Sequence, residues 1–380
     1  MNLPLLEAIF NVDVLKEIRA VLQALTGMAS FCTCGLSGEI RRPFHDTVGL
    51  GWTMPRVLHV GPCNARGGMA TVMRTLAEHP PDGWNADLLA TYSEGGVWSK
   101  WRAYRRARRE LIEQCRDSSN RPDVVHFHAA SDWSWRRKIR LAGVARRLGV
   151  PVVIHLHSGK FDRWLGAVGH RRGIAVRAAH ERLDACVVVL SENWAARLEV
   201  HLGPLHAVNN PVHPRFQPGA GPKDTKHLLL LGRNDPVKGH AFAIEVVDAL
   251  RSKHPNLKLT LTGVANVDDP SINARGWVSD AEVLELMQRA TLLLVPSEYE
   301  GQPMVVLEAL ACGLPVLANA SLGSLPETAA LAELNVQSWV NAIEPFLQHP
   351  QPPATLPEHH RLSAVKERWR QLYEDSTNTD

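Results

Sequence analysis

Short runs of Val, Ile and Leu alternate with longer segments of helical periodicity from Arg56 almost to the end of the chain. Continuous apolar runs separated by helices are typical of a parallel sheet covered on both faces. The first series of predicted strands comprises Arg56–Val60, Ala86–Ala90, Val124–Phe127, Val152–His155 and Ala185–Leu190. The predicted helices between these strands include Ala70–Ala77, Trp101–Cys115 and Ile139–Leu148.

A second alternating series follows the Pro/Gly-rich stretch HPRFQPGAGPKDTKH at residues 213–227, which is typical of a linker. Its predicted strands are Leu228–Leu231, Leu257–Thr262, Leu292–Val295 and Val316–Ala318. Its predicted helices are Ala241–Lys253, Ala281–Arg289 and Val305–Ala311. The fold class predicted is therefore α/β, with two doubly wound parallel-sheet (Rossmann-like) domains that face each other across a ligand-binding cleft.

The domain boundaries follow from this alternation. We expect an N-terminal domain over 54–212, a linker over 213–226 and a C-terminal domain over 227–350. A segment over 351–380 carries a helix near 361–374 and is expected to return toward the first domain. Residues 1–53 do not fit the alternation, apart from one amphipathic helix predicted from Val14 to Leu25. We interpret them either as an extension, disordered or outside the native fold, or as a misassigned start upstream of Met54.

Charge divides the chain more clearly than its total of +3 suggests. Residues 54–212 hold 24 basic and 14 acidic side chains, whereas residues 213–380 hold 14 and 20. Such an asymmetry indicates different partners for the two halves. The six cysteines are scattered and lack ligand spacing, which disfavours a zinc site or a disulfide framework and favours a reducing cytosol. We predict neither a signal peptide nor a membrane span.

Three motifs place polar groups at predicted strand ends. In GPCNARGGMATVMRTL (61–76), Gly67 and Gly68 open a helix and allow backbone N–H groups to approach an anion. The alternative is an ordinary strand-to-helix turn. In LLLLGRNDPVKGHAFAIEV (228–246), Arg233 and Lys238 follow a buried strand and are well placed for a diphosphate. The alternative is a pair of solvated surface cations.

The third motif is VPSEYEGQPMVVLEALACGLPVLA (295–318). A polar turn with Glu300 precedes a helix in which Pro303 is expected at the first position and Glu308 in the second turn. Free N–H groups between Gly301 and Met304 would meet an anion or a sugar oxygen. Alternatively, Glu300 caps the helix and Glu308 is solvated, although an apolar helix suits a solvated Glu308 poorly.

These motifs, together with VVHFHAASDWSWRRK, VPVVIHLHSGKFDRW, VVVLSENWAARL and VNNPV, resemble the retaining glycosyltransferases of family 4, with the GT-B fold. The resemblance runs from about Arg56 to Tyr373 and is nearest to bacterial surface-polysaccharide members. Members of this family transfer a sugar from a nucleotide-sugar to an acceptor hydroxyl. The chain departs from the family at EGQP (300–303), where many members carry E-G-F-G, so its contacts to the donor sugar are expected to differ.

The resemblance implies roles for individual residues. Arg233 and Lys238 would neutralise the donor diphosphate, and Glu308 would accept from the ribose hydroxyls. Catalytic roles fall to His157, which would contact the donor sugar or stabilise its reacting face, and to Glu300, which would hold the sugar. The remaining substrate-binding positions are Gly67, Gly68, Trp277, Gly301, Gln302, Pro303 and Met304, with Ser191 and Asn209 as supporting residues of the cleft.

No D-x-D motif occurs anywhere in the chain, so the usual carboxylate pair for a sugar-nucleotide metal is missing. We therefore expect a metal-independent reaction with no cofactor other than the nucleotide-sugar co-substrate. His126 and His128 alternate along one predicted strand and share a face, which would allow them to bind a metal. Satisfied structural histidines are the more common outcome of that pattern, so no metal site is predicted.

Six of the ten residues from Lys100 to Arg109 are basic, with Trp101 and Tyr104 among them. Arg136, Arg137, Lys138 and Arg140 follow Trp133 and Trp135. A basic helix with aromatics suits an anionic membrane surface. A merely solvated face is the alternative, and nucleic acid is not expected because no RNA- or DNA-binding motif accompanies the run.

The leading hypothesis is a cytoplasmic glycosyltransferase, of the hexosyltransferase type, peripheral on the inner face of the membrane. It would use a saccharide or lipid-linked acceptor in polysaccharide or lipopolysaccharide biosynthesis. Two alternatives remain open: a nucleotide-sugar epimerase of the same architecture, and a catalytically silent scaffold bound to the membrane.

Overall fold

The computed structural model describes residues 54–378, so the helix predicted between Val14 and Leu25 lies outside the described part. The first sheet has six parallel strands in the order β2-β1-β3-β4-β5-β6. Its strands are β1 (Arg56–Gly61), β2 (Asn85–Ala90), β3 (Val124–Ala129), β4 (Val152–Leu156), β5 (Cys186–Val189) and β6 (His206–Ala207). The helices that connect them are α3 (Gly68–Glu78), α4 (Val97–Arg116), α5 (Trp133–Arg147), α6 (Phe161–Leu165), α7 (Arg171–Arg182) and α8 (Glu192–Leu202).

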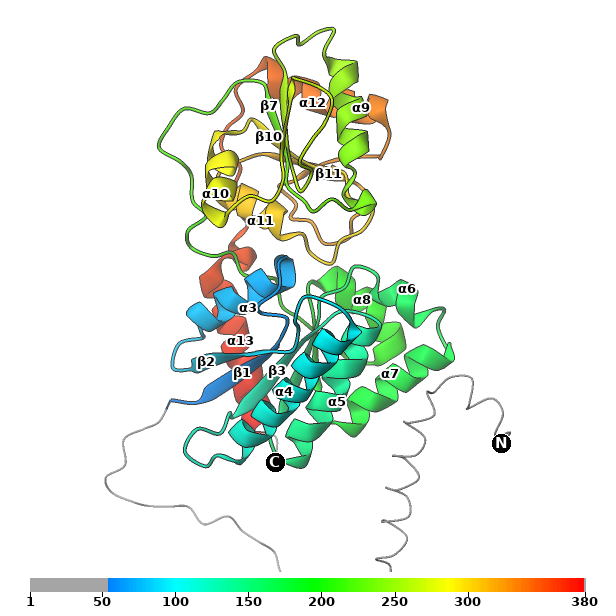
Figure 1. Ribbon diagram of the computed structural model, residues 1–380, viewed down its shortest axis with the longest axis vertical. Coiled ribbons are helices and arrows are strands. Elements are labelled where there is room, and N and C mark those ends of the chain that lie inside the picture. Colours follow the sequence, from blue (N-terminus) through cyan, green and yellow to red (C-terminus); the bar gives the residue numbers. More distant parts are fainter. Residues whose placement is uncertain (1–53, 379–380) are drawn as a thin grey trace, which may run out of the picture. The chain divides into compact units, whose positions relative to one another are not determined.

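The second sheet is also parallel and six-stranded, in the order β12-β11-β10-β7-β8-β9. Its strands are β7 (His227–Leu230), β8 (Lys258–Thr262), β9 (Ile272–Arg275), β10 (Leu292–Val295), β11 (Val316–Asn319) and β12 (Ala330–Ala332). Its helices are α9 (His240–Leu250), α10 (Asp280–Arg289), α11 (Met304–Ala311) and α12 (Val336–Gln348). Both sheets and their flanking helices can be followed in Figure 1. The predicted α/β class with two doubly wound parallel sheets is confirmed.

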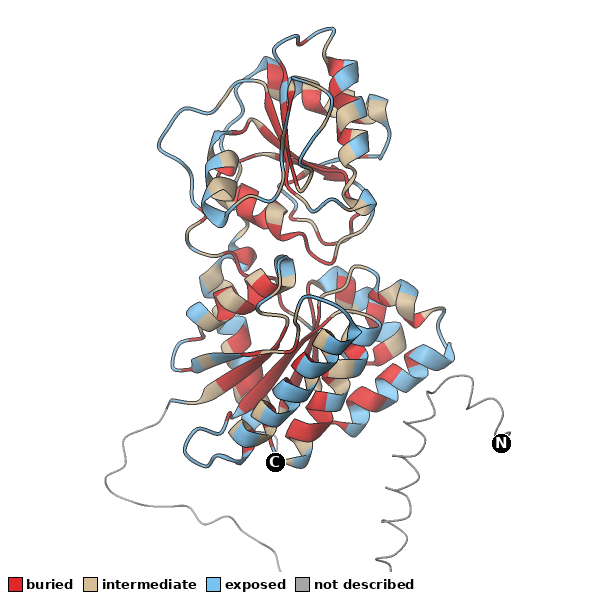
Figure 2. Ribbon diagram, in the orientation of Figure 1, coloured by how far each residue is buried: buried red, intermediate tan, exposed pale blue. Residues whose placement is uncertain are grey.

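The central strands of both sheets are buried along their whole length, as Figure 2 shows. Helices cover both faces of the first sheet, so β3 and β4 carry no solvent-facing side chain and consist of apolar residues and buried histidines. The strands without a predicted counterpart are β6, β9 and β12, which are short edge strands. Edge strands are half-solvated, so they lack the apolar run on which strand prediction depends.

Helix α13 (Leu362–Asn378) ends the described chain and packs on β3 of the first sheet. Val365, Trp369, Leu372 and Tyr373 form its buried stripe. The hydroxyl of Tyr373 lies 2.7 Å from Nδ1 of His126, so the last helix joins the first sheet through a buried polar contact as well as through apolar packing. Among residues 54–378, every helix is too short or too polar to cross a bilayer.

Candidate active site

Two loops pack directly on each other at the carboxyl ends of β7 and β8. Gly263 follows β8 with φ of +81°, and a Cβ there would stand 2.2 Å from the carbonyl oxygen of Gly232. The Gly263 N–H donates to the carbonyl of Gly276 at 2.7 Å, which brings the turn before α10 to the same edge. Only glycine fits such a close backbone approach. Arg233 and Trp277, which follow these glycines, are thereby held at one edge of the second sheet.

A pocket of about 350 Å³ opens at this edge. Residues of the second sheet's loops and of the loops after β1 and β2 line it together: Ala65, Arg66, Tyr92, Glu94, Arg233, Asn234, Gly263 and Trp277. The guanidinium of Arg66 lies 4.9 Å from the ring centre of Trp277. The size is within the range of small-molecule sites, and the position fits the rule that ligands bind at the carboxyl ends of parallel strands.

A larger hollow of about 970 Å³ lies at the opposite, amino end of β7, β8 and β9. Its histidine, His227, is already paired with Thr260 at 2.8 Å and with Asp224 at 3.3 Å. Because that edge of a doubly wound sheet is not where ligands ordinarily bind, we place the candidate site in the smaller pocket and its surroundings.

Lys238 and Glu300 form an ion pair next to this pocket, with side chains about one-fifth exposed. The N–H of Glu298 donates to the carbonyl of Val237 at 3.0 Å, so the turn before α11 is attached to the turn before α9. Gly239 adopts φ of +74° between Lys238 and α9. The structure thus brings the second and third sequence motifs together, and Lys238 carries its charge beside the carboxylate of Glu300.

The end of β4 lies against the same turn. A Cβ on Gly159 would stand 2.3 Å from the carbonyl carbon of Glu300, and one on Gly301 would stand 2.4 Å from the carbonyl oxygen of His157. A third close approach joins α3 to α11, since a Cβ on Gly68 would meet Cγ of Met304 at 3.2 Å. These contacts bring together five of the predicted residues: Gly68, His157, Glu300, Gly301 and Met304. A Cβ added to Gly67, in contrast, would meet no atom within 4 Å.

The segment from Gly301 to Met304 is held by side chains of the first domain. Trp194 donates to the Gly301 carbonyl at 2.7 Å. The Gln302 amide accepts from the Asn210 N–H at 2.7 Å and donates to Asn209 at 2.9 Å, so this side chain is occupied within the protein. Within residues 54–378 the N–H groups of Gly301, Gln302 and Met304 have no hydrogen-bond partner.

Pro303 is the N-cap of α11, and Met304 is its first residue, one position later than expected. The extended backbone of Pro303 (ψ 112°) explains the difference, because the chain still has to turn into the helix. The missing Pro303 N–H also reduces the number of free donors in the predicted 301–304 segment.

Ser191, which is predicted as a supporting residue of the cleft, makes a polar contact with the second domain. Its hydroxyl lies 2.7 Å from the hydroxyl of Ser324.

Glu308 is 6% exposed, in the second turn of α11, and within residues 54–378 its carboxylate has no hydrogen-bond or ion-pair partner. Burial raises its pKa to about 7; nearby Arg215 opposes the rise and Asp280 adds to it. The interpretation of Glu308 as a solvated surface carboxylate is therefore wrong. A buried carboxylate without a partner is costly unless a ligand supplies hydrogen-bond donors.

His157 is linked to two other histidines of the first sheet. Its Nε2 lies 3.0 Å from Nδ1 of His128, and Nε2 of His128 lies 3.0 Å from Nδ1 of His59. Burial lowers the pKa of His157 to about 3, with a further decrease from the nearby charge of Lys138. His59 is not among the residues predicted from the sequence; the signal for its burial is its position within RVLHVG, where every residue from Val57 to Gly61 is buried.

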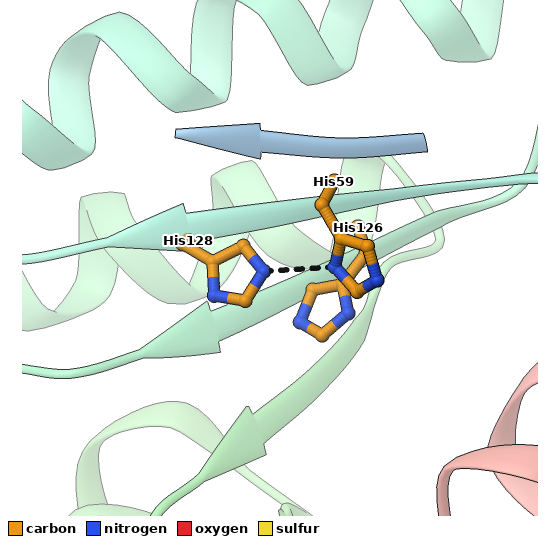
Figure 3. Close-up of side chains that lie close together, drawn as sticks. All are labelled: His59, His126 and His128. Carbon is orange, nitrogen blue, oxygen red and sulfur yellow. Dashed lines mark hydrogen bonds between the residues drawn. The ribbon is translucent and has the colours of Figure 1, made fainter. Parts of the chain in front are cut away.

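The ring nitrogens of His59, His126 and His128 lie within 4.8 Å of one another, close enough for a metal ion to be considered. Figure 3 shows the three side chains and the contact between His59 and His128. The rings of His126 and His128 are stacked, 4.1 Å apart at 16°, so their in-plane lone pairs run nearly parallel instead of converging. Metal ligands point their lone pairs at one centre, so this arrangement would need both rings to turn.

Lys138 does not lie on the basic surface where the sequence predicts it. It is 2% exposed, on the buried stripe of α5 with Trp135 and Leu141. Burial lowers its pKa to about 7, with a smaller contribution from Arg137. Its spacing from Trp135 and Leu141, three residues on either side, is the sequence signal that would have identified it.

The rest of the basic, aromatic surface is exposed as expected at several positions. Val97, Trp98 and Trp101 near the start of α4 and Trp133 at the start of α5 are 82%, 74%, 48% and 68% exposed. Helices α4 and α5 pack together, and both begin at the carboxyl edge of the first sheet. Tyr104 differs, because it packs against the core beneath the helix.

Comparison with known proteins bears on the family and the fold of this chain. Residues 91–216 match the family model "Glycosyltransferase Family 4", and residues 215–361 match "Glycosyl transferases group 1". Glycogen synthase of Mycobacterium tuberculosis is 30% identical over 251 residues, which cover 59% of this chain and 57% of that protein. D-inositol 3-phosphate glycosyltransferase of Pseudarthrobacter chlorophenolicus is 26% identical over 301 residues, 68% of this chain and 70% of that protein.

Among solved structures, sucrose-phosphate synthase from Thermosynechococcus elongatus superposes with a TM-score of 0.60 at 18% identity, covering 84% of this chain and 98% of that one. This likeness concerns the fold. The chain spans little more than half the length of its glycogen synthase relative. Because the two family models match in succession over residues 91–361 and the fold agrees, the chain belongs to the glycosyltransferases of family 4, with the GT-B architecture.

Proposed function

We propose that this protein transfers a sugar from a nucleotide-sugar to a saccharide acceptor, with retention at the anomeric carbon. In this proposal Arg233 and Lys238 bind the donor diphosphate, and Glu308 accepts from the ribose hydroxyls. Trp277 lies beside the base. His157 and Glu300, with the free N–H groups after Glu300, hold the donor sugar.

The pairing of Lys238 with Glu300 is the observation that carries the proposal. It joins the phosphate-binding and sugar-binding motifs at one point, next to a pocket that both halves of the chain line. The unpaired N–H groups at the start of α11 add donors and the positive end of a helix dipole. Family membership and the named activities of the relatives support the same reaction class.

The departing nucleotide diphosphate develops negative charge that some group has to stabilise. We propose that Arg233, Lys238 and the N–H groups at the start of α11 do so without a divalent metal, since the chain has no D-x-D motif. Preorganised cations and backbone donors of this kind stabilise a transition state by roughly 3–4 kcal/mol each.

We further propose a lipid-linked acceptor, at the cytoplasmic face of a membrane, in the assembly of a polysaccharide or lipopolysaccharide. The support is the exposed apolar group Val97, Trp98, Trp101 and Trp133, surrounded by arginines on α4 and α5. Both helices begin at the carboxyl edge of the first sheet, so an acceptor held at a membrane would approach the cleft from that edge.

A thermal-shift screen against UDP-, GDP- and ADP-sugars tests the donor assignment without knowledge of the acceptor. We expect one nucleotide series to raise Tm, because a ligand that binds only the folded state stabilises it. The shift should disappear in Arg233→Ala and Lys238→Ala and persist in Arg289→Ala, whose cation lies at the opposite edge of the second sheet. No response to any series would contradict the proposal. Acceptor-free interconversion of the sugar would instead indicate an epimerase.

A further inference from the structure

Three histidines on neighbouring strands form a continuous hydrogen-bonded chain that ends at the candidate site. His59 on β1, His128 on β3 and His157 after β4 are joined Nδ1 to Nε2 at 3.0 Å in each link. The first two are fully buried, and His157 is partly exposed. Strands β1, β3 and β4 are adjacent in the sheet. His59 is in register with His126 and His128 with His155, so the histidine chain runs diagonally and moves two residues toward the carboxyl edge at each link.

All three imidazoles are neutral at physiological pH. Burial lowers the pKa of His59 and of His157 to about 3 and that of His128 well below its usual value. A neutral imidazole has one N–H donor and one bare nitrogen, and the identity of the donor is set by its partner. Once one link is oriented, the other two tautomers follow.

The buried end of the histidine chain, at His59, decides the direction in which its hydrogen bonds run. Nε2 of His59 is buried and within residues 54–378 has no hydrogen-bond partner. If protons were donated from His157 toward His59, this nitrogen would carry an N–H with nothing to receive it. In the opposite direction it is a bare acceptor, and orphaned buried N–H groups are rarer in proteins than under-satisfied acceptors.

We infer that His59 and His128 fix His157 as a hydrogen-bond donor. His59 Nδ1–H donates to Nε2 of His128, His128 Nδ1–H donates to Nε2 of His157, and the remaining Nδ1–H of His157 is directed to the substrate. Nδ1 of His157 has no partner in the described part of the chain, which leaves it available to an oxygen of the bound sugar or phosphate. His59 and His128 are thus positioning residues, and His157 acts as a donor and cannot abstract a proton.

This inference rests on the proposed function only for the identity of the ligand; the tautomer itself is a property of the free protein. We would label the histidines of the full-length protein with ¹⁵N and read each tautomer from two-bond ¹H–¹⁵N correlations. The expected result is Nδ1–H for His59, His128 and His157 together. This is the less common form of free histidine, so chance agreement of all three would be unusual. An Nε2–H or doubly protonated His157 would overturn the inference.

Metal content gives an independent check. One equivalent of bound Zn²⁺ or another transition metal that is lost in His59→Leu would also overturn the inference, because a metal-bound nitrogen cannot take part in the chain. A protein that carries no metal after purification in the presence of Zn²⁺ supports it. Neither readout needs a donor or an acceptor, so failure here and failure of the proposed function are separate results.

Variants test whether the hydrogen-bonded histidines affect turnover. We expect His128→Leu to lower kcat for donor hydrolysis on the order of tenfold to a hundredfold, with KM changed little, as when a group that orients a ligand-contacting histidine is lost. His128→Asn keeps an amide donor beside Nε2 of His157 and should recover much of that loss.

The matched control is His155→Leu. His155 is as buried as His128 and close to His157, but neither of its ring nitrogens has a partner within residues 54–378. It should stay within about twofold of the wild-type rate, since no hydrogen bond is lost. Equal losses in His155→Leu and His128→Leu would contradict the positioning role, and a restored rate in His128→Asn would exclude misfolding as the cause.

Discussion

Gly159 lies directly against the backbone of Glu300, so that a Cβ at position 159 would stand 2.3 Å from the Glu300 carbonyl carbon. No side chain tolerates that distance, and the neighbour is backbone, which cannot swing aside. The contact joins the end of β4 to the turn that carries Glu300 and Gly301. His157, two residues before Gly159, is held beside the same turn.

Gly159→Ala should therefore displace the turn and destabilise the protein by about 1–3 kcal/mol, as overpacking generally does. We expect a lower Tm and a larger loss of donor affinity than of stability, because Glu300 and Gly301 move together. Gly96→Ala is the control, since a Cβ there meets nothing within 4 Å. A Gly159→Ala protein with wild-type donor affinity would show that this turn does not hold the donor.

Glu308→Gln should separate stability from ligand binding. The pKa of Glu308 is raised from 4.5 to about 7, so the protonated form is favoured in the folded state. The stability that this form contributes is fully present below pH 4.5 and is lost as pH rises toward 7 and above. The wild type should then be less stable than Glu308→Gln by up to about 3 kcal/mol at pH 8, and equal to it near pH 4.5.

The predicted change in stability is tested by measuring Tm from pH 4.5 to 8. Glu285→Gln, at an exposed position, is the control and should leave the pH dependence of Tm unchanged. The same Glu308→Gln protein should lose nucleotide affinity at pH 8, because the ionised acceptor for the ribose hydroxyls is gone. An undiminished affinity would remove Glu308 from the proposed binding site.

Trp277→Ala should weaken nucleotide binding, whereas Trp277→Phe should retain most of it. Trp277 is 56% exposed at the pocket, and the Arg66 guanidinium lies over one face of its ring, so a planar base would stack on the other face or displace that guanidinium. A loss of about 1–3 kcal/mol in binding free energy is the usual value of one base–aromatic stack. Isothermal titration with the nucleotide found in the screen measures it. Trp133→Ala is matched in exposure and in its arginine neighbour, and should bind normally.

Replacing Trp98 and Trp101 together by Ser should reduce binding to vesicles that contain anionic lipid. Each of these side chains is largely exposed on a helix that is rich in arginine. Co-sedimentation with anionic vesicles measures the change, and neutral vesicles should bind neither protein. The Trp277→Ala variant, which alters an exposed tryptophan elsewhere, should sediment like the wild type. Equal binding by all three proteins would contradict a membrane role for α4.

The local sequence of this protein determined its secondary structure and its fold class. Runs such as VVHFH and LLLV are buried throughout because parallel strands are covered on both faces, and helices with 3.6-residue periodicity must lie between them. The motifs also gave the family and therefore the approximate places of Arg233, Lys238, His157 and Glu300, because those residues follow strand ends that meet at a common edge.

Tertiary structure decided which of these groups touch. The ion pair of Lys238 with Glu300, the packing of Gly159 on Glu300 and the two links from His59 to His157 join residues that lie 29 to 141 positions apart in the sequence. The burial of Glu308 was decided there too, because the exposure of a carboxylate depends on what packs over it. Periodicity fixes which face a side chain occupies, whereas strand order and helix packing fix its neighbours.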